Sequence, residues 1–183
     1  MRQEIKLKYI RDDRNWKLEK HERGNGIDLY ADAILDCQIY EGEYINLDKA
    51  KENEKDTNGY RISDLNEFFI MGEKLTFYKG DVVTFGLGVA MELPQGYFAN
   101  VRPRSSIFNN FKAIQVNSVG LIDDTYNGDS DEWRVQILFL DDVEIKRGDR
   151  LCQFTLEKMM EVNFQEVENL GNEDRGGYGT SGK

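Results

Sequence analysis

The stretch RVQILF at residues 134–139 places Val135, Ile137 and Phe139 at alternate positions. An arginine precedes Val135, and a glutamine separates Val135 from Ile137. A period of two is typical of a β-strand that has one buried face. The segment 5–9, in which isoleucine, leucine and tyrosine alternate with lysines, repeats the pattern. The dominant pattern of the chain therefore predicts strands, and no long amphipathic helix is visible.

Turn signals separate these short apolar runs. They are YKGD at 78–81, LPQGY at 93–97, YNGD at 126–129 and KRGD at 146–149. Glycine, proline and Asn/Asp residues supply the backbone conformations that tight turns need. Short strands at this spacing predict an all-β domain, either a sandwich, a jelly roll or a barrel. A length of 183 residues favours a single domain.

One segment departs from this pattern. Residues 48–60, DKAKENEKDTNGY, are almost wholly polar and predict a loop. A short helix is expected after it, with Asp64 as its cap and Glu67 three residues further on. We interpret residues 48–72 as a surface insertion and leave a partner-binding role open. The apolar face of its helix would consist of Leu65, Phe68 and Phe69.

Composition limits the classes of function. The formal net charge is −10, whereas binding to long nucleic acids requires a basic surface. A small anionic ligand is compatible with this charge, because a few arginines and a metal ion can hold it. The N-terminus lacks a signal-peptide core and no apolar run has the length of a membrane span, so we expect a cytoplasmic protein. Cys37 and Cys152 lie far apart in the sequence and are expected to be reduced.

The chain contains one histidine, His21, within the polar stretch LEKHERGNG. A solvent-exposed loop residue is the favoured interpretation of this side chain. Any general base is therefore expected to be a carboxylate. A zinc-dependent deaminase is excluded, because the His/Cys/Cys ligand set of those enzymes is missing.

Five short segments stand out for their chemistry. In chain order they are GIDLYA at 26–31, RPRSS at 102–106, NSVGLIDDTY at 117–126, GDRLCQF at 148–154 and RGGYGTSG at 175–182. In this order and at these intervals they resemble the five motifs of the homotrimeric all-β dUTPases, bacterial or phage-like. The resemblance runs from about Gly26 to the C-terminus and omits the 48–72 segment.

The resemblance implies a distorted jelly roll of the β-clip type, with one domain at 1–174 and a flexible C-terminal lid arm at 175–183. It implies hydrolysis of dUTP to dUMP and pyrophosphate with Mg²⁺, by in-line attack of water on the α-phosphate. It also implies a homotrimer whose three sites lie at subunit interfaces. A phage-encoded member would act in the cytoplasm of the host.

Two motifs offer groups for phosphates. Arg104, Ser105 and Ser106 supply a guanidinium, hydroxyls and turn amides. The resemblance assigns a phosphate contact to Ser105 and a phosphate and water contact to Gln153. It also implies that Asp28, which has apolar neighbours on both sides, helps to hold a hydrated metal ion through water.

The third motif is expected to contact the base and the sugar of the substrate. Asn117 and Tyr126 bracket a segment that we interpret as a β-hairpin, and its backbone groups plus the Asn amide can match the edge of uracil. The resemblance implies that Asn117 and Gly120 contact the substrate. It places Tyr126 under the deoxyribose, where the ring would exclude a 2′-hydroxyl. A buried core aromatic is the alternative for Tyr126.

Asp123 matches the carboxylate that orients the attacking water in this family. Its neighbour Asp124 should face the other way, because adjacent strand residues point to opposite faces.

In the tail, the resemblance implies that Arg175 contacts the γ-phosphate and that Tyr178 stacks on uracil. The spacing between these two residues is shorter than is usual in the family, and the common aromatic is Phe. Trp133 is a second lid candidate, although a buried position is favoured for it. The remaining arm contacts would be Gly179, Thr180 and Ser181.

Two alternative functions remain open. A dCTP deaminase-like activity is one, because those enzymes share the fold and an arginine-serine motif. The other is a regulatory or protein-binding role on a dUTPase scaffold, with residues 48–72 as the interaction surface.

Overall fold

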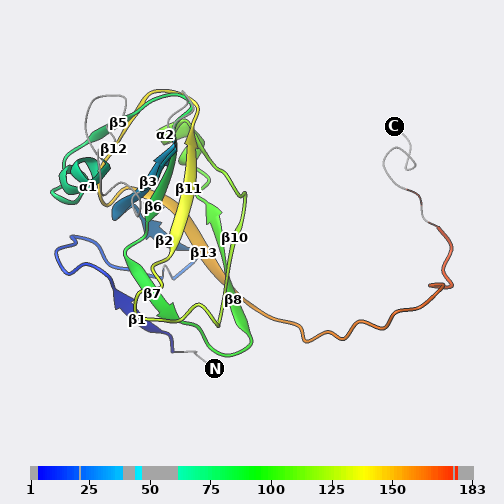
Figure 1. Cartoon of the computed structure of the whole chain (residues 1–183). Coiled ribbons are helices and arrows are strands. Elements are labelled where there is room, and N and C mark those ends of the chain that lie inside the picture. Colours follow the sequence, from blue (N-terminus) through cyan, green and yellow to red (C-terminus); the bar gives the residue numbers. More distant parts are fainter. Residues whose placement is uncertain (1–3, 21, 39–43, 47–61, 175, 177–183) are drawn as a thin grey trace.

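The computed structural model of the chain describes residues 4–20, 22–38, 44–46, 62–174 and 176 (Figure 1). A five-stranded sheet has the order β4 (Tyr44–Asn46), β3 (Ala33–Gln38), β6 (Val82–Gly86), β11 (Arg134–Phe139), β9 (Ala113–Gln115). A four-stranded sheet has the order β10 (Gly120–Asp123), β8 (Tyr97–Pro103), β13 (Arg150–Lys158), β2 (Ile27–Tyr30). Two further pairs are β1 (Lys6–Tyr9) with β7 (Val89–Glu92), and β12 (Val143–Ile145) with β5 (Leu75–Phe77). The all-β prediction is confirmed.

Strand β11 spans the residues whose alternation predicted it. It lies between β6 and β9, and its odd-numbered side chains Val135, Ile137 and Phe139 are buried. Its partners on both sides run antiparallel, with Ile137 opposite Val83 on β6. The period of two in the sequence thus corresponds to one face that is turned into the core.

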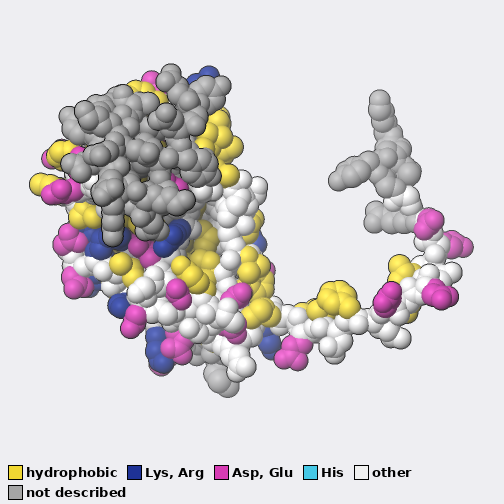
Figure 2. All heavy atoms as spheres, viewed as in Figure 1, with side chains coloured by type: hydrophobic (Ala, Val, Ile, Leu, Met, Phe, Trp, Pro, Cys, Tyr) yellow, Lys and Arg dark blue, Asp and Glu magenta, His cyan; other side chains and the backbone are white. Residues whose placement is uncertain are grey.

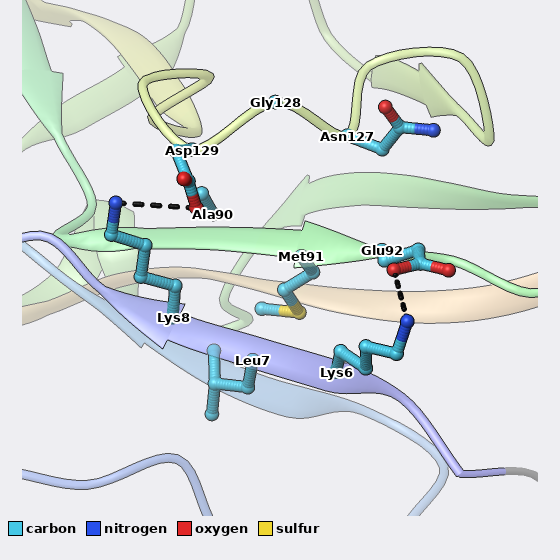
Figure 3. A pocket seen from close by; sticks show the side chains of 9 residues that line it. All are labelled: Lys6, Leu7, Lys8, Ala90, Met91, Glu92, Asn127, Gly128 and Asp129. Carbon is cyan, nitrogen blue, oxygen red and sulfur yellow. Dashed lines mark hydrogen bonds and ion pairs between the residues drawn. The ribbon is translucent and has the colours of Figure 1, made fainter.

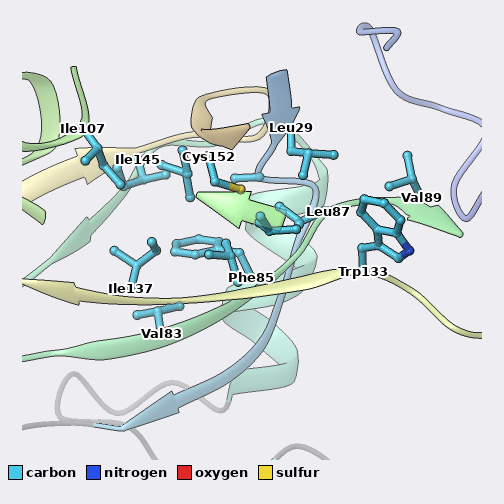
Figure 4. Close-up of a cluster of buried hydrophobic side chains, with 14 of the residues drawn as sticks. Leu29, Val83, Phe85, Leu87, Val89, Ile107, Trp133, Ile137, Ile145 and Cys152 are labelled. Carbon is cyan, nitrogen blue, oxygen red and sulfur yellow. The ribbon is translucent and has the colours of Figure 1, made fainter. Parts of the chain in front are cut away.

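The two larger sheets turn their apolar side chains into one core (Figure 4). Phe77 stacks on Phe139 with 5.1 Å between ring centroids, and Phe85 packs edge-on against both rings. The four-stranded sheet contributes Leu29, Val101, Leu151 and Phe154 to the same cluster. This packing fixes the relative positions of the strands that carry the predicted site residues.

The helix of the insertion begins earlier than predicted. Helix α1 spans Ile62–Ile70, so Asp64 lies within its first turn and is not its cap. Phe69 is fully buried as expected, but Phe68 is 42% exposed and does not share the buried face. Tertiary contact decides this orientation, because Asn66 Oδ1 accepts a 2.8 Å hydrogen bond from the backbone of Ile34 on β3. Residues 48–61 of the insertion lie outside the described residues.

The second helix, α2 (Ile107–Phe111), is short and follows the arginine-serine motif. No helix in the described part of the chain is long and apolar enough to cross a membrane.

Beyond β13 the chain leaves the body of the molecule (Figure 1). Residues 160–174 have no regular structure, and every one of them is exposed. The segment is nevertheless partly apolar, with Met160 83%, Phe164 96% and Leu170 82% exposed, and Figure 2 shows hydrophobic side chains along it. Such a segment has no core of its own within one chain.

Candidate active site

Three neighbouring strands bring together the residues of the first, second and fourth motifs. Gln153 on β13 lies opposite Asp28 on β2 and opposite Arg102 on β8. Arg104 follows β8 directly, and its Nε donates a 2.8 Å hydrogen bond to Asp28 Oδ1. The predicted phosphate cluster is therefore assembled within one sheet from distant parts of the sequence, with Asp28 and Arg104 76 residues apart.

Asp28 is 8% exposed, and arginines hold both of its oxygens. Arg104 binds Oδ1, and Arg150 donates to Oδ2 at 3.1 Å. Two guanidinium groups against one carboxylate leave a net positive charge, which suits an anionic ligand. Arg150 stands in the GDR segment, but no sequence pattern singled it out as a site residue. Burial of the Cys152 side chain raises the pKa of its thiol, and the charge of Asp28 raises it further, which disfavours the nucleophilic thiolate form.

The arginine-serine turn is anchored at two points of its backbone. The Arg104 amide donates to the Leu151 carbonyl at 3.3 Å, and the Arg104 carbonyl accepts from Ile107 at 3.0 Å. Ser105 between them is exposed, whereas Ser106 is half-buried and its hydroxyl lies 3.4 Å from Arg104 NH1. The turn therefore offers a hydroxyl and a guanidinium on the same side of the α2 start.

Gly26 makes room for the glutamine of the fourth motif. A Cβ added at Gly26 would collide with Gln153 Oε1, so a larger residue at this position would displace the end of the Gln153 side chain. Gln153 is half-buried beside Gly26, and it lies directly opposite Asp28 in the pairing of β13 with β2.

The segment that was predicted to be a hairpin connects two different sheets. β9 pairs with β11 in the five-stranded sheet, whereas β10 pairs with β8 in the four-stranded sheet. Ser118 takes a left-handed backbone with φ of 58°, which turns the chain from one sheet edge to the other. The hairpin prediction is wrong, because the pairing partner of each strand is set by the core.

Within this connection, Asn117 is exposed, and a hydrogen bond from a buried residue fixes its side chain. Gln115 Nε2 donates a 2.9 Å hydrogen bond to Asn117 Oδ1. Gly120, which begins β10, lies close to the other end of the amide, because a Cβ added there would be 3.5 Å from Asn117 Nδ2.

The two neighbouring carboxylates of the third motif diverge. Asp123 Oδ1 accepts hydrogen bonds from the backbone amide and the hydroxyl of Thr125. These bonds, the side-chain one first, lower the pKa of Asp123, so the carboxylate is ionised at neutral pH. Asp124 Oδ2 instead accepts a 2.6 Å hydrogen bond from the Gly96 amide and holds the turn before β8.

Tyr126 is anchored to a charged network that the sequence analysis missed. Its hydroxyl donates at 3.3 Å to the carbonyl of Glu132. Glu132 is 6% exposed. Its carboxylate accepts hydrogen bonds from Arg11 at 2.7 Å and from the Gly88 amide at 2.9 Å. The same Arg11 reaches the fully buried Asp32 at 2.8 Å. Charged residues are mostly exposed, and no signal in the pattern alone identified these as buried.

Trp133 is fully buried and packs edge-on against Phe154, with 5.1 Å between ring centroids. It is a core residue, as favoured from the sequence, and it is no longer a lid candidate. The arm residues Arg175, Tyr178, Gly179, Thr180 and Ser181 lie outside the described residues, as does His21.

The predicted site residues form two separate clusters in one chain. Asp123 pairs with Phe98 at the start of β8, whereas Arg104 follows the end of that strand. Six residues of extended chain separate the two points, which corresponds to about 20 Å. Asp123 and the cluster around Arg104, as placed in a single chain, are therefore too far apart to fulfil their predicted roles on one phosphate.

A pocket of about 170 Å³ lies between the β1–β7 pair and residues 127–129, which directly follow the third motif (Figure 3). Both of its lysines are paired with carboxylates. Lys6 lies 2.8 Å from Glu92, and Lys8 lies 3.3 Å from Asp129. This pocket offers no uncompensated positive charge to a triphosphate, and we do not assign the substrate to it.

Comparison with known structures supports the fold. The dUTPase of Staphylococcus bacteriophage 80alpha with dUPNHPP superposes with a TM-score of 0.64 at 14% identity, over 98% of this chain and 99% of that one. The dUTPase of Streptococcus mutans gives 0.58 at 17% identity, over 88% of this chain and all of that one. The predicted dUTPase-like jelly roll is thereby confirmed.

Comparison of sequences extends the relationship to the family. The prophage SPbeta-derived deoxyuridine 5'-triphosphate nucleotidohydrolase YosS of Bacillus subtilis is 38% identical over 180 residues, which are 98% of each chain. The deoxyuridine 5'-triphosphate nucleotidohydrolase of Corynebacterium glutamicum is 40% identical over 103 residues, 54% of this chain and 67% of that protein. The dUTPase family model matches residues 70–182. Because the match covers more than half of the chain and the prophage relative aligns over nearly its whole length, the chain belongs to the dUTPase family.

Proposed function

We propose that this chain hydrolyses dUTP to dUMP and pyrophosphate with the help of Mg²⁺. The observation that carries the proposal is the combination of an ionised carboxylate at Asp123 with an arginine-rich cluster around Asp28 and Arg104. Family membership and the names of the bacterial and prophage relatives support dUTP as the substrate.

In the proposed reaction, Asp123 orients a water molecule for in-line attack on the α-phosphate. The new bond joins the water oxygen to that phosphorus, the bond to the bridging α–β oxygen breaks, and pyrophosphate leaves. A carboxylate of lowered pKa is a weak base, so its main contribution is to position the water and to accept the proton late. Thr125 fixes the carboxylate through its two hydrogen bonds.

The phosphates are assigned to the other cluster. Asp28 occupies Arg104 Nε and Ser106 Oγ accepts one long hydrogen bond from Nη1, so the remaining N–H groups of that guanidinium are assigned to phosphate oxygens. Ser105, Ser106 and Gln153 add neutral donors, and we assign Arg175 to the γ-phosphate. These groups stabilise charge that moves onto the leaving pyrophosphate.

The residues present suit a magnesium ion that is held mainly by the substrate. No group of three His, Cys, Asp or Glu side chains in the described part of the chain is arranged to bind a metal ion. Because arginines occupy both oxygens of Asp28, this carboxylate would reach the ion through water. Mg²⁺ tolerates such a site, since it keeps several waters and binds phosphate oxygens. When bound, it neutralises charge on the triphosphate.

The base and sugar are assigned to the third motif. Asn117 and the backbone near Gly120 would pair with the uracil edge, and the Tyr126 ring would lie against the deoxyribose. The hydrogen bond from Tyr126 to the Glu132 carbonyl supports this role, because it fixes a ring that is 36% exposed. A fixed ring can exclude a ribose 2′-hydroxyl, whereas a mobile one would yield.

A homotrimer with shared sites is part of the proposal, and the separation of the two clusters supports it. Since Asp123 and Arg104 of one chain are about 20 Å apart along β8, each site needs Asp123 from another copy. Exposed apolar residues are available for such contacts. Leu121 on β10 is 64% exposed, and the segment 160–170 carries Phe164 and Leu170 away from the body. Association would bury this surface.

The last residues, 175–183, are proposed to close over the bound triphosphate as a lid. Tyr178 would stack on the uracil, and the amides around Gly179, Thr180 and Ser181 would line the phosphates. The glycines make ordering of this segment costly, so the charged substrate must offset the lost entropy.

Product analysis tests the proposed function most simply. Purified protein with dUTP and Mg²⁺ should release dUMP and pyrophosphate in equal amounts. Release of orthophosphate, or conversion of dCTP to a deaminated product, would contradict the proposal. The second outcome would favour the deaminase alternative.

A second candidate function is protein binding through the insertion. Helix α1 and the turn after it leave Phe68 42% and Met71 71% exposed. The dUTPase of Staphylococcus bacteriophage 80alpha, which shares this fold, is one of the phage dUTPases that control transfer of virulence genes. Replacement of Phe68 and Met71 by serine should leave dUTP hydrolysis intact. A partner protein that copurifies equally well with this double variant would argue against an interface at α1.

A further inference from the structure

A buried glutamine stands behind the proposed base-reading residue. Gln115 ends β9 and is 5% exposed, and its Nε2 donates to the Val101 carbonyl at 3.1 Å and to Asn117 Oδ1 at 2.9 Å. We propose that Gln115 is a positioning residue that fixes which end of the Asn117 amide faces the base, and that it thereby sets the preference for uracil over cytosine. The inference rests on the proposed role of Asn117.

The orientation of both amides follows from one backbone group. The carbonyl of Val101 can only accept a hydrogen bond, so the Gln115 atom that faces it must be the amide nitrogen. The same nitrogen contacts Asn117, and the facing Asn117 atom must therefore be the acceptor Oδ1. An asparagine without such a partner could turn its amide by 180° at little cost.

The donor end of Asn117 is consequently turned outward. Its Nδ2 lies beside Gly120, where a Cβ would come within 3.5 Å. The residue is exposed, and no acceptor in the described part of the chain takes a hydrogen bond from this Nδ2. An NH₂ group presented in this way matches the carbonyl at position 4 of uracil. Cytosine carries an amino group there, and two donors facing each other would leave both unpaired.

The other end of Gln115 argues against a purely structural role for this amide. Its Oε1 is buried and has no hydrogen-bond partner among the described residues. An unpaired buried acceptor destabilises the folded state, and an apolar side chain of similar size would avoid that cost. The benefit of a glutamine at this position therefore lies in its donor side, which acts on Val101 and Asn117.

The test compares kcat/KM for dUTP, dCTP and UTP in the Gln115→Leu variant with full-length protein and Mg²⁺. We expect the dUTP/dCTP ratio to fall about 10-fold, the effect of one ordinary hydrogen bond. The dUTP/UTP ratio should stay unchanged, and the melting temperature should be equal or higher. Gln136→Leu is the matched control, because its half-buried amide on the neighbouring strand reaches Thr84 and no site residue.

A second variant, Gln115→Glu, should improve the use of dCTP, which loss of the Gln115 side chain alone would not do. In Gln115→Glu, a protonated carboxyl can donate to the Val101 carbonyl and accept from Asn117 Nδ2. The Asn117 amide would then turn its oxygen toward the base and accept from the amino group of cytosine. The dUTP/dCTP ratio should fall further than in Gln115→Leu, with a gain in kcat/KM for dCTP itself.

The Asn117→Ala variant separates failure of this inference from failure of the base assignment. If Asn117→Ala lowers the dUTP/dCTP ratio but Gln115→Leu does not, Gln115 has no positioning role and the base assignment stands. If neither variant changes the ratio, Asn117 does not read the base, and both ideas are wrong. A fall in both substrate ratios together with a lower melting temperature in Gln115→Leu would also overturn the inference.

Discussion

Asp123 ends β10 with a carboxylate that Thr125 holds in place, and its proposed task is to orient water. We expect Asp123→Asn to lower kcat by about 10²–10⁴-fold, because an amide cannot accept the proton. Binding of dUMP, measured by calorimetry, should be nearly unchanged. Asp124→Asn is the control, since it keeps an acceptor for the Gly96 amide and should retain activity. Equal damage to turnover and to dUMP binding in Asp123→Asn would indicate a structural role.

Thr125 offers a pH test of the same carboxylate. Its hydroxyl is the first cause of the lowered pKa of Asp123, and the ionised form is therefore retained as the pH falls. Thr125→Val removes that donor at nearly constant volume, so the pKa of Asp123 should rise. The acid limb of the kcat/KM profile should then move to higher pH, whereas Thr125→Ser should leave it in place. An unchanged acid limb in Thr125→Val would mean that another group controls it.

At the level of elements, buried ion pairs tie the N-terminal loop, the end of α1 and the β12–β13 turn together. Arg147 donates at 2.9 Å to the fully buried Asp32 and at 3.0 Å to the Ile70 carbonyl. Arg147→Met should cost about 3 kcal/mol in the free energy of unfolding, because a buried charge loses one partner. Arg11 remains as the second partner of Asp32 and limits the loss.

Chemical denaturation measures this cost, and Lys74→Met provides the comparison. Lys74 and Glu144 form an exposed ion pair between the segment before β5 and β12, and solvent screening should make its contribution small. If Arg147→Met is no more destabilising than Lys74→Met, the buried network does not hold these elements together.

The sequence predicted those elements whose pattern is local. Strand β11 was predictable because alternation over residues 134–139 reflects one buried face, and the motif residues of β2, β8 and β13 were predictable from their resemblance. The start of α1 was missed, because the Asp64 pattern looks like a cap while contacts to β3 favour an earlier beginning.

Other features depend on tertiary pairing and were not predictable. The third motif was interpreted as a hairpin, since nothing local reveals that β9 and β10 belong to different sheets. Arg11 and Glu132 looked like surface charges, and only the fold brings them together. Gln115 carried one usable signal, because a polar residue at the inward position of an alternating strand is unusual.

At the level of the whole molecule, residues 175–183 should contribute to activity and not to the stability of the domain. Deletion of these residues should lower kcat/KM for dUTP strongly, because the arm is assigned contacts to the triphosphate. The melting temperature should barely change, and dUMP should bind equally well with and without the arm. A truncated enzyme with full kcat/KM would show that the arm is not a lid.

The proposed dUTP-hydrolysing site is completed by two or more copies of the chain. Arg104→Ala and Asp123→Asn should each be inactive as pure proteins, and they should be mixed after dissociation or by coexpression. If the phosphate cluster and Asp123 come from different chains, random assembly restores about a quarter of the sites, and formation of dUMP and pyrophosphate should recover to about that level. If both groups acted from one chain, the mixture would stay as inactive as its components, and the shared-site account would be contradicted.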